Sequence, residues 1–600
     1  MYRKIIFTIL CCLVFVSHGF AATHYVTPSG AGGHDGTTVG NAWSQAEFEA
    51  LTGTGYAGDT FYFSESSPFG SDIDVGILGT SGNQVVLDGY EAGSCDPWND
   101  SCANGADVLN FNLGPNDYIT IQDFDINYGD YGITMTDNLI NTGLIIRHNH
   151  FYSQSGASIQ CQYCVDPIIW DNYIEQTGTN YEHCIDLRPI RGGKIIHNKI
   201  RGDSSNTATG IWFATAYSWA GNDGIISDNI VAGNDVGGIW QEAISFDNFS
   251  SGAATNSLEY DTISSTGANT VTLSDAGWSA AGNDLYNNAY MFFLTGDLKG
   301  NAYQITDQAL GVFTFSETVS SAGNGDIIVI GVPFLNNYVG YNTVSDYGWN
   351  YASVLLYGVT YGTLIEGHTD ESANTSAAIT IHHDSGGYEH TGSITGVCAY
   401  FPAFNNLAYN NTINNIDSIY FFIPGQCGSS DPYYAYYNTI VDNTLGIDVK
   451  LGYEYSYVYG STIGVDSSNY TNNSTWKYKN PYIIGTPYIS LAGSVYIDWS
   501  ETVDFTGYTN GDLYLTTAAD IETTIALNSS SGSGAAWVFT PASTPVQGET
   551  YKLWHNGTAD SIVNAADNDM IVVGYKPISN YYEDPITDPP STHRVLVIGN

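Results

Sequence analysis

Five side chains between positions 183 and 242 are candidates for transferring protons or stabilising charge in a reaction. Asp186 and Glu242 are carboxylic acids, and His183, Arg188 and Lys194 can act as bases or cations. Two carboxyl groups can hydrolyse a glycosidic bond when one protonates the leaving oxygen and the other activates water or attacks carbon. A base with a nearby cation can instead carry out β-elimination beside a uronate carboxylate. The residue types therefore keep both reactions open.

A second set of side chains could bind sugars. Aromatic rings can stack on the apolar faces of sugar rings, and amides can bind the hydroxyls. We assign this role to two amides and three indoles, Gln160, Gln162, Trp212, Trp219 and Trp240. Outward-facing Trp side chains expose costly apolar surface. The alternative is that a loop or an inserted module covers them as additional core.

A repeat positions these side chains. Its isoleucines are spaced 26, 26, 26 and 28 residues apart, at Ile133, Ile159, Ile185, Ile211 and Ile239. A period in the twenties with a strand-like phrase in each repeat indicates a solenoid whose coils share one core. Strand side chains alternate between two faces, so an inward Ile places the residues one and three positions later on the outer face.

This register puts the candidate residues on one outer stripe. Successive coils carry, on their outer face, Gln160 and Gln162, then Asp186 and Arg188, then Trp212, then Trp240 and Glu242. The inward column continues later in the chain through Val354, Ile379, Ile419 and Ile447. Asp186 and Glu242 would then lie two coils apart, with their Cα atoms separated by about 10 Å. Side-chain reach would allow the ~6.5–9.5 Å separation of inverting glycosidases.

A column of asparagines supports the same repeat. Asn149, Asn172, Asn198 and Asn229 each follow an Ile-rich pair. Asn tolerates left-handed backbone angles and suits tight bends, so stacked copies predict an amide ladder. The N-x-[IV] phrase, the coil length and the opening Tyr25-Val26-Thr27-Pro28-Ser29-Gly30 with Gly58-Asp59-Thr60 resemble secreted right-handed parallel β-helix proteins of the pectate-lyase-like superfamily.

The resemblance covers roughly residues 23–250 and 333–500, and it implies the fold rather than the reaction. Its members use either hydrolysis or elimination. The chain lacks the Asp-Asp pair followed by Gly-His-Gly that polygalacturonase-like hydrolases would have, and it has no clear lyase signature.

The chain divides into five regions. Residues 1–21 have the basic start, apolar run and small residues of a secretory signal peptide. Residues 22–250 form the first part of the solenoid with its cap, 251–332 an inserted antiparallel β module, 333–500 further coils, and 501–600 a β-rich C-terminal region. We therefore expect an all-β, secreted (extracellular or periplasmic) protein with no segment that crosses a membrane.

Cysteines beyond the signal peptide are expected to be structural, because export permits disulfides. Cys95 and Cys102 bracket a short polar loop and form the best candidate pair. Cys161 faces inward in the Ile register, as a small buried apolar residue would. His382-His383-Asp384 is not a predicted metal site, because neighbours on a strand point opposite ways.

The formal net charge is −46, from 61 acidic and 15 basic residues. Such a surface excludes nucleic-acid binding, which depends on basic side chains. Solubility in a salty medium explains the charge most simply, and calcium bridging between carboxylates and substrate is the alternative. Six basic residues gather locally, and they could offset a substrate carboxylate or pair with neighbouring acids: Arg147, Arg188, Arg191, Lys194, Lys199 and Arg201.

These observations predict a right-handed parallel β-helix that acts on a polysaccharide in a cleft on its outer face, as a lyase or a hydrolase. The alternative function is a non-catalytic surface, adhesin-type or carbohydrate-binding protein.

Overall fold

The computed structural model describes residues 21–64, 68–89, 106–114, 117–127, 129–135, 140–176, 183–214, 226–247, 259–274, 286–348, 352–372, 377–382, 402–414, 417–422, 435–436, 438–445, 449–451, 457–459, 482–490, 492–500, 502–505, 508–517, 523–533, 535–546, 550–555, 562–564 and 576–580. The predicted signal peptide (except Ala21) and Cys95 and Cys102 lie outside these residues. Within them, no helix has the length and apolar character needed to cross a bilayer.

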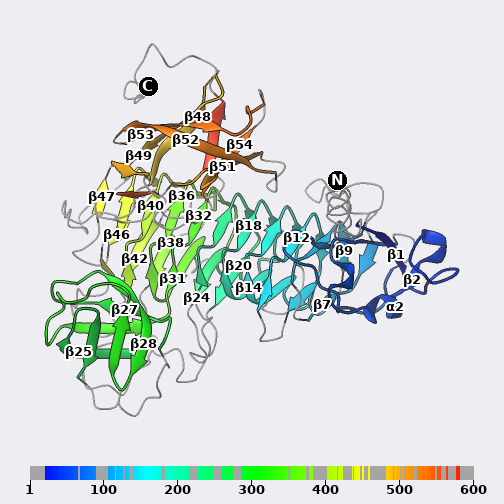
Figure 1. Cartoon of the computed structure of the whole chain (residues 1–600), viewed down its shortest axis with the longest axis horizontal. Helices are drawn as coiled ribbons and strands as arrows, with labels where there is room; N and C mark the ends of the chain where they lie inside the picture. Colours follow the sequence, from blue (N-terminus) through cyan, green and yellow to red (C-terminus); the bar gives the residue numbers. More distant parts are fainter. Residues whose placement is uncertain are drawn as a thin grey trace, which may run out of the picture.

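Three parallel sheets wind into a parallel β-helix (Figure 1), and this confirms the predicted fold class. One coil shows the pattern: β17 (Ile185–Arg191), β18 (Lys194–Ile196) and β19 (Lys199–Arg201) each join a different sheet. We call these the β17, β18 and β19 sheets. The coils run from β1 (Thr23–Thr27) to β47 (Tyr457–Tyr459).

The β17 sheet carries the side chains of interest. Along the solenoid its strands pair in parallel in the order β7 (Phe111–Leu113), β10 (Ile133–Met135), β14 (Ile159–Val165), β17, β20 (Ile211–Ala214), β24 (Ile244–Asp247), β34 (Val354–Tyr357) and β38 (Ala377–His382). The β18 sheet continues through β15 (Ile168–Trp170), β22 (Ile230–Ala232) and β36 (Leu364–Glu366).

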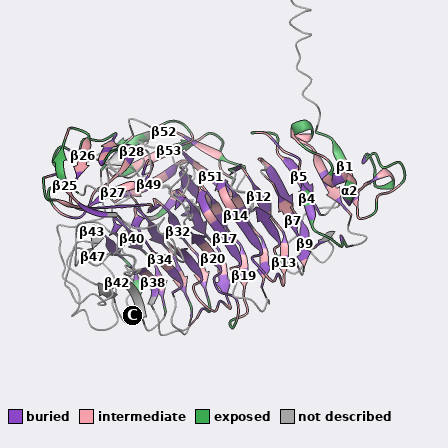
Figure 2. Cartoon of the chain, turned by 90° about the horizontal axis from the view of Figure 1, so that it is seen from below, coloured by how far each residue is buried: buried purple, intermediate pink, exposed green. Residues whose placement is uncertain are grey.

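The inward isoleucine column belongs to the core, and most strand residues of the solenoid are buried (purple in Figure 2). Ile133, Ile159, Ile185 and Ile211 pair in register and are fully buried, as predicted. The fifth position was predicted wrongly. Ile239 is buried, but the register partner of Ile211 is Ile244, five residues later.

The shift arises because residues 239–243 run beside residues 207–210 before the strand begins. The backbone N–H of Trp240 donates to the Thr207 carbonyl at 2.8 Å, and that of Gln241 to the Ala208 carbonyl at 2.9 Å. Burial of an isoleucine thus does not fix its register. Further along, Val449 pairs with Ile419 in the place predicted for Ile447, which lies outside the described residues.

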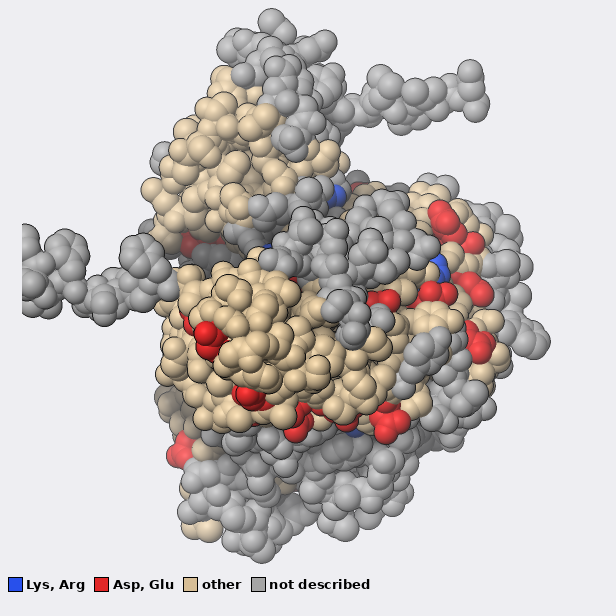
Figure 3. Space-filling model, turned by 90° about the vertical axis from the view of Figure 1, so that its right-hand side faces the viewer, with Lys and Arg blue, Asp and Glu red and all other residues tan. Residues whose placement is uncertain are grey.

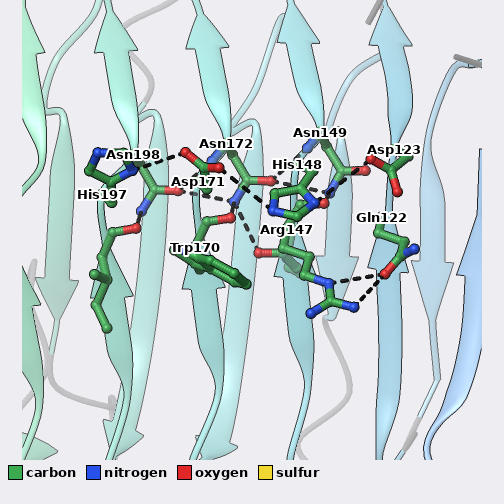
Figure 4. A network of polar contacts seen from close by, with 12 residues as sticks. Gln122, Asp123, Arg147, His148, Asn149, Trp170, Asp171, Asn172, His197 and Asn198 are labelled. Atoms are coloured by element: carbon green, nitrogen blue, oxygen red, sulfur yellow. Dashed lines mark hydrogen bonds and ion pairs between the residues drawn. The ribbon is translucent and has the colours of Figure 1, made fainter. Parts of the chain in front are cut away.

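The asparagine ladder is confirmed (Figure 4). The Nδ2 of Asn149 donates to Oδ1 of Asn172 at 3.1 Å, and Asn172 donates likewise to Asn198 at 3.0 Å. Asn198 continues to Asn234, whereas Asn229 belongs to a second ladder at the preceding turn. Each ladder amide satisfies backbone groups that a tight turn leaves without partners.

The first coil is capped by α2 (Gln45–Glu49). Ser44 and Glu47 form a capping box at its start, and Phe48 packs edge-on against the rings of Phe61 and Phe63. The cap covers apolar core that the end of a solenoid would otherwise expose.

Two β-barrel modules flank the C-terminal half of the solenoid (Figure 1), and their strands pair antiparallel except for the parallel pair of the first and last strands of the C-terminal barrel. The inserted barrel has its own core and contains β25 (Glu259–Thr266), β26 (Thr270–Leu273), β27 (Tyr290–Phe293), β28 (Ala302–Ala309), β29 (Val312–Phe315) and β30 (Ile327–Gly331). The C-terminal barrel contains β48 (Ile483–Ile489), β49 (Val495–Trp499), β51 (Leu513–Thr517), β52 (Ile525–Ser533), β53 (Ala536–Pro541), β54 (Tyr551–His555) and β56 (Lys576–Asn580).

The C-terminal barrel docks on the outer face of the β18 sheet. Trp554 is buried there with Trp170 and Ile196. Lys576 reaches from β56 to Glu366 on β36, and both side chains are almost fully buried. The apolar contact together with this ion pair fixes the barrel on the solenoid.

Cys161 and Cys164 form a disulfide on β14. Cys161 is fully buried, as the register predicts, but it is not the unpaired apolar residue that we expected. The two cysteines are three positions apart on β14 and both lie in the core, and the inward assignment of Cys161 alone did not reveal the bond between them.

Candidate functional site

The outer face of the β17 sheet carries a column of polar side chains along the solenoid axis. Strand register places one residue of the column on each coil, in the order Asp74, Asn112, Thr134, Gln160, Asp186, Trp212 and Ser245. Neighbours bond from coil to coil: Thr134 Oγ1 donates to Gln160 Oε1 at 3.2 Å, and Gln160 Nε2 donates to Asp186 Oδ2 at 3.0 Å. Successive coils lie about 4.8 Å apart. Thr134, Gln160, Asp186 and Ser245 are buried, whereas Trp212 is half-buried and Asp74 is exposed.

Asp186 and Arg188 form a two-pronged ion pair. The Nε of Arg188 donates to Oδ1 of Asp186 at 2.7 Å, and a terminal guanidinium nitrogen donates to Oδ2 at 2.7 Å. Asp186 is 1% exposed. Both carboxylate oxygens accept from Arg188 and one also accepts from Gln160, so three hydrogen bonds hold Asp186 in place.

Trp212 lies against two side chains of the preceding coil. Its ring stacks on the His183 imidazole with centroids 4.0 Å apart, and the Arg188 guanidinium carbon lies 4.6 Å from an indole centroid. The indole is half-buried. The prediction of an outward Trp212 is confirmed, but part of its ring surface is covered by the protein itself.

His183 is held as a neutral imidazole. Burial lowers its pKa to about 4, with Arg188 acting in the same direction and Asp186 opposing it. Its Nδ1 atom is buried and has no hydrogen-bond partner among the residues that the structure describes. A neutral ring with an unused nitrogen can accept a hydrogen bond from a group that reaches it.

Glu242 occupies the equivalent position two coils later. The backbone of Cys184 bonds to Thr209 and that of Gly210 bonds to Glu242, so His183, Thr209 and Glu242 follow one another across three coils. Burial raises the pKa of Glu242 to about 7; the charge of Asp247 adds to this, and the Thr209 hydroxyl, 3.5 Å away, opposes it. Glu242 can therefore hold a proton near neutral pH, as a general acid must.

The remaining predicted residues lie elsewhere. Lys194 belongs to the β18 sheet, where its Nζ donates to the Tyr514 hydroxyl at 3.3 Å, so it does not join Asp186 and Glu242. Trp240 lies in the segment before β24 and not in the column, because Ser245 takes that place. Gln162 pairs with Arg188 in the register beside the column. Trp219 is outside the described residues.

Sequence reasoning missed Thr209, Asp247 and the N-terminal part of the column. There a surface hollow of about 360 Å³ is lined by residues including Glu49, Asp74, Asn112 and Thr134. We call it the N-terminal hollow. Extending the outward register one coil backward from Thr134 would have found Asn112, but the partners of Glu242 depend on the shifted register at Ile244.

The protein is acidic overall, but near the site basic side chains are paired with acidic ones. Figure 3, which looks onto the N-terminal end, shows carboxylates scattered over the described surface and few basic side chains. Arg188 and Arg201 are both ion-paired to Asp residues, which accounts for part of the basic cluster. Among the described residues no group of three or more His, Cys, Asp or Glu side chains is arranged to hold a metal ion.

No protein-family model and no curated protein sequence matches the chain. Solved structures similar to it include the A-module of the mannuronan C-5 epimerase AlgE6 from Azotobacter vinelandii (12% identity, 74% of this chain and 91% of that chain, TM-score 0.36). Others are a GH136 lacto-N-biosidase from Eubacterium ramulus (11%, 75% and 67%, TM-score 0.33) and the tailspike protein of E. coli bacteriophage HK620 in complex with a pentasaccharide (12%, 84% and 80%, TM-score 0.30). The fold assignment rests on the strand pairing of this chain itself.

Proposed function

We propose that this protein is an exported enzyme that cleaves a polysaccharide lying along the outer face of the β17 sheet. The observation that carries the proposal is Glu242, a carboxyl group with a pKa of about 7 beside a hydrogen-bonded polar column. The N-terminal hollow and the half-buried ring of Trp212 offer surface for a sugar, whereas the column members Thr134, Gln160, Asp186 and Ser245 are buried.

In the reaction that fits best, Glu242 gives its proton to the glycosidic oxygen as the bond to the anomeric carbon breaks. Asp247, the acid whose charge helps to keep Glu242 protonated, takes a proton from the water that attacks that carbon.

β-Elimination is the second candidate, and it is favoured by one observation. His183 is neutral and has an unused Nδ1 two coils from Glu242, so it could remove the proton beside a uronate carboxylate while Glu242 protonates the leaving oxygen. The proton donor is common to the two reactions, and the proton acceptor distinguishes them.

The test uses a panel of neutral and uronate polysaccharides, each assayed with calcium and with a chelator. Reducing ends without new absorbance near 235 nm would support hydrolysis, whereas reducing ends with that absorbance would support elimination. Asp247→Asn should abolish the first activity and His183→Gln the second. Retention of a glycan without cleavage of any panel member would overturn the enzyme proposal in favour of a binding protein.

A further inference from the structure

A second hollow lies where the solenoid meets the C-terminal barrel. It has a volume of about 390 Å³, within the range of small-molecule sites, and we call it the junction hollow. The residues that matter in its lining are Asp166, Arg191, Gly192, Lys194, Asp228 and Tyr514. None of these residues belongs to the column on the β17 sheet, so the hollow is separate from the proposed active site.

The floor of the hollow is the turn between β17 and β18. This turn is Arg191-Gly192-Gly193-Lys194, with Gly192 at a φ of +64°. A Cβ atom on Gly192 would come within 2.2 Å of Oδ1 of Asp166. The turn therefore carries cations at its two ends, and the Asp166 carboxylate occupies the space that a side chain at Gly192 would need.

Acids from the neighbouring coils flank this floor. The amide N–H of Asp166 donates to the Arg191 carbonyl at 2.8 Å, and that of Gly192 donates to the Ser227 carbonyl at 3.0 Å, next to Asp228. Asp166 and Asp228 thus lie one coil before and one coil after Gly192. Burial raises the pKa of Asp228, which indicates a partly desolvated carboxyl group.

The C-terminal barrel supplies the remaining wall. Tyr514 of β51 meets Lys194 at 3.3 Å, with the Nζ 5.9 Å from the centroid of its ring, and His555 of β54 also lines the hollow. The lining combines two carboxylates, two cations and an aromatic ring from two parts of the chain. Its charges sum to about zero on a protein of net charge −46.

This balance limits the ligand. An anionic ligand would meet Asp166 and Asp228, and a cationic ligand would meet Arg191 and Lys194, so either would face a like charge. A neutral ring bearing several hydroxyls could donate to the carboxylates and accept from the cations at the same time. We propose that the junction hollow is a binding site for a neutral sugar residue, which anchors a glycan without cleaving it.

The proposal is tested with the full chain on a printed array of neutral gluco-, galacto- and manno-oligosaccharides and, on the same slide, oligouronates. The variants Asp228→Asn and Asp166→Asn keep the side-chain shape and remove one charged acceptor each. Asp35→Asn, an exposed acid in the N-terminal region, is the matched control. Glu242→Gln is included as protein in which the proposed cleavage is disabled.

We expect wild-type protein and Glu242→Gln to retain at least one neutral oligosaccharide equally. Each hollow variant should weaken that retention by about tenfold or more, as loss of a charge-assisted hydrogen bond implies, and Asp35→Asn should not. Asp166 is exposed, so its variant tests the site even if Asp228→Asn fails to fold. Retention of no neutral glycan, retention that both hollow variants leave unchanged, or dependence on the hollow for oligouronates alone would overturn the proposal. None of these outcomes depends on cleavage, so the proposed enzyme function stands or falls separately.

Discussion

The carboxylate of Asp186 receives two parallel hydrogen bonds from Arg188, two residues further along the same strand, at 2.7 Å each. Both side chains point to the outer face of β17, and Gln160 of the preceding coil adds a third bond to the carboxylate. This pair sits beneath Trp212, whose ring lies over the guanidinium. Asp186, which we predicted to be catalytic, is thus held by three hydrogen bonds.

Arg188→Met should destabilise the protein by about 3 kcal/mol, because it leaves the 1%-exposed Asp186 as a buried charge without its cation. Urea unfolding at pH 7 measures the loss. Arg201→Met is the matched control, since Arg201 and Asp235 are about one-third exposed and such pairs contribute less than about 1 kcal/mol. Equal losses in the two variants would show that Asp186 is not held as described.

The raised pKa of Glu242 predicts how stability changes with pH. A folded-state pKa of about 7 lies above the ordinary value of 4.5, so the folded protein binds the proton more tightly than the unfolded chain. The stabilisation from protonation is fully present below pH 4.5 and is lost as pH rises through about 7, by roughly 3 kcal/mol. Glu242→Gln should flatten this part of the stability curve. An unchanged pH dependence in Glu242→Gln would mean that Glu242 titrates like an exposed acid.

The sequence sufficed for the fold because the isoleucine and asparagine columns recur at the coil period, and each repeat imposes the same inward and outward faces. The prediction of strand register from the sequence was wrong where the period of the repeat changes. Ile239 and Ile244 are both buried, and only the pairing of β24 with β20 reveals which one follows Ile211. For that reason the sequence wrongly placed Trp240 in the outer column, and it did not identify Thr209 and Asp247 as neighbours of Glu242.

Lys194 illustrates a second limit. The sequence shows where Lys194 lies in the repeat. Its partners, Tyr514 and Trp554, lie more than three hundred positions away in the C-terminal barrel. No local pattern in the sequence predicts which face of the solenoid that barrel covers.

The asparagine ladder should be costly to interrupt. Asn172 donates to the Ile146 and Trp170 carbonyls and to Asn198, and it accepts from Asn149. Asn172→Ala leaves several of these buried groups without partners, so we expect a loss of about 4 kcal/mol in unfolding free energy by urea titration. Asn83→Ala, at an exposed turn, serves as the control and should cost less than about 1 kcal/mol. A small effect at Asn172 would mean that water replaces the ladder.

The ion pair between Lys576 and Glu366 should determine how firmly the C-terminal barrel is held. Lys576→Met leaves Glu366 buried beside the Tyr338 hydroxyl without its cation, at a cost of about 3–5 kcal/mol. Limited proteolysis should then release the barrel faster than in wild-type protein. Adding Glu366→Gln should restore part of the resistance, because it removes the uncompensated charge. Equal proteolysis of Lys576→Met and wild-type protein would argue against this contact.

The most direct test of the central claim is the rate of polysaccharide cleavage by Glu242→Gln beside wild-type protein across pH 5 to 9. We expect the wild-type rate to fall as pH rises through about 7, and Glu242→Gln to be at least about 100-fold slower at every pH while it still retains the polysaccharide. A variant that cleaves at the wild-type rate, with the same pH profile, would contradict the assignment of Glu242 as the proton donor.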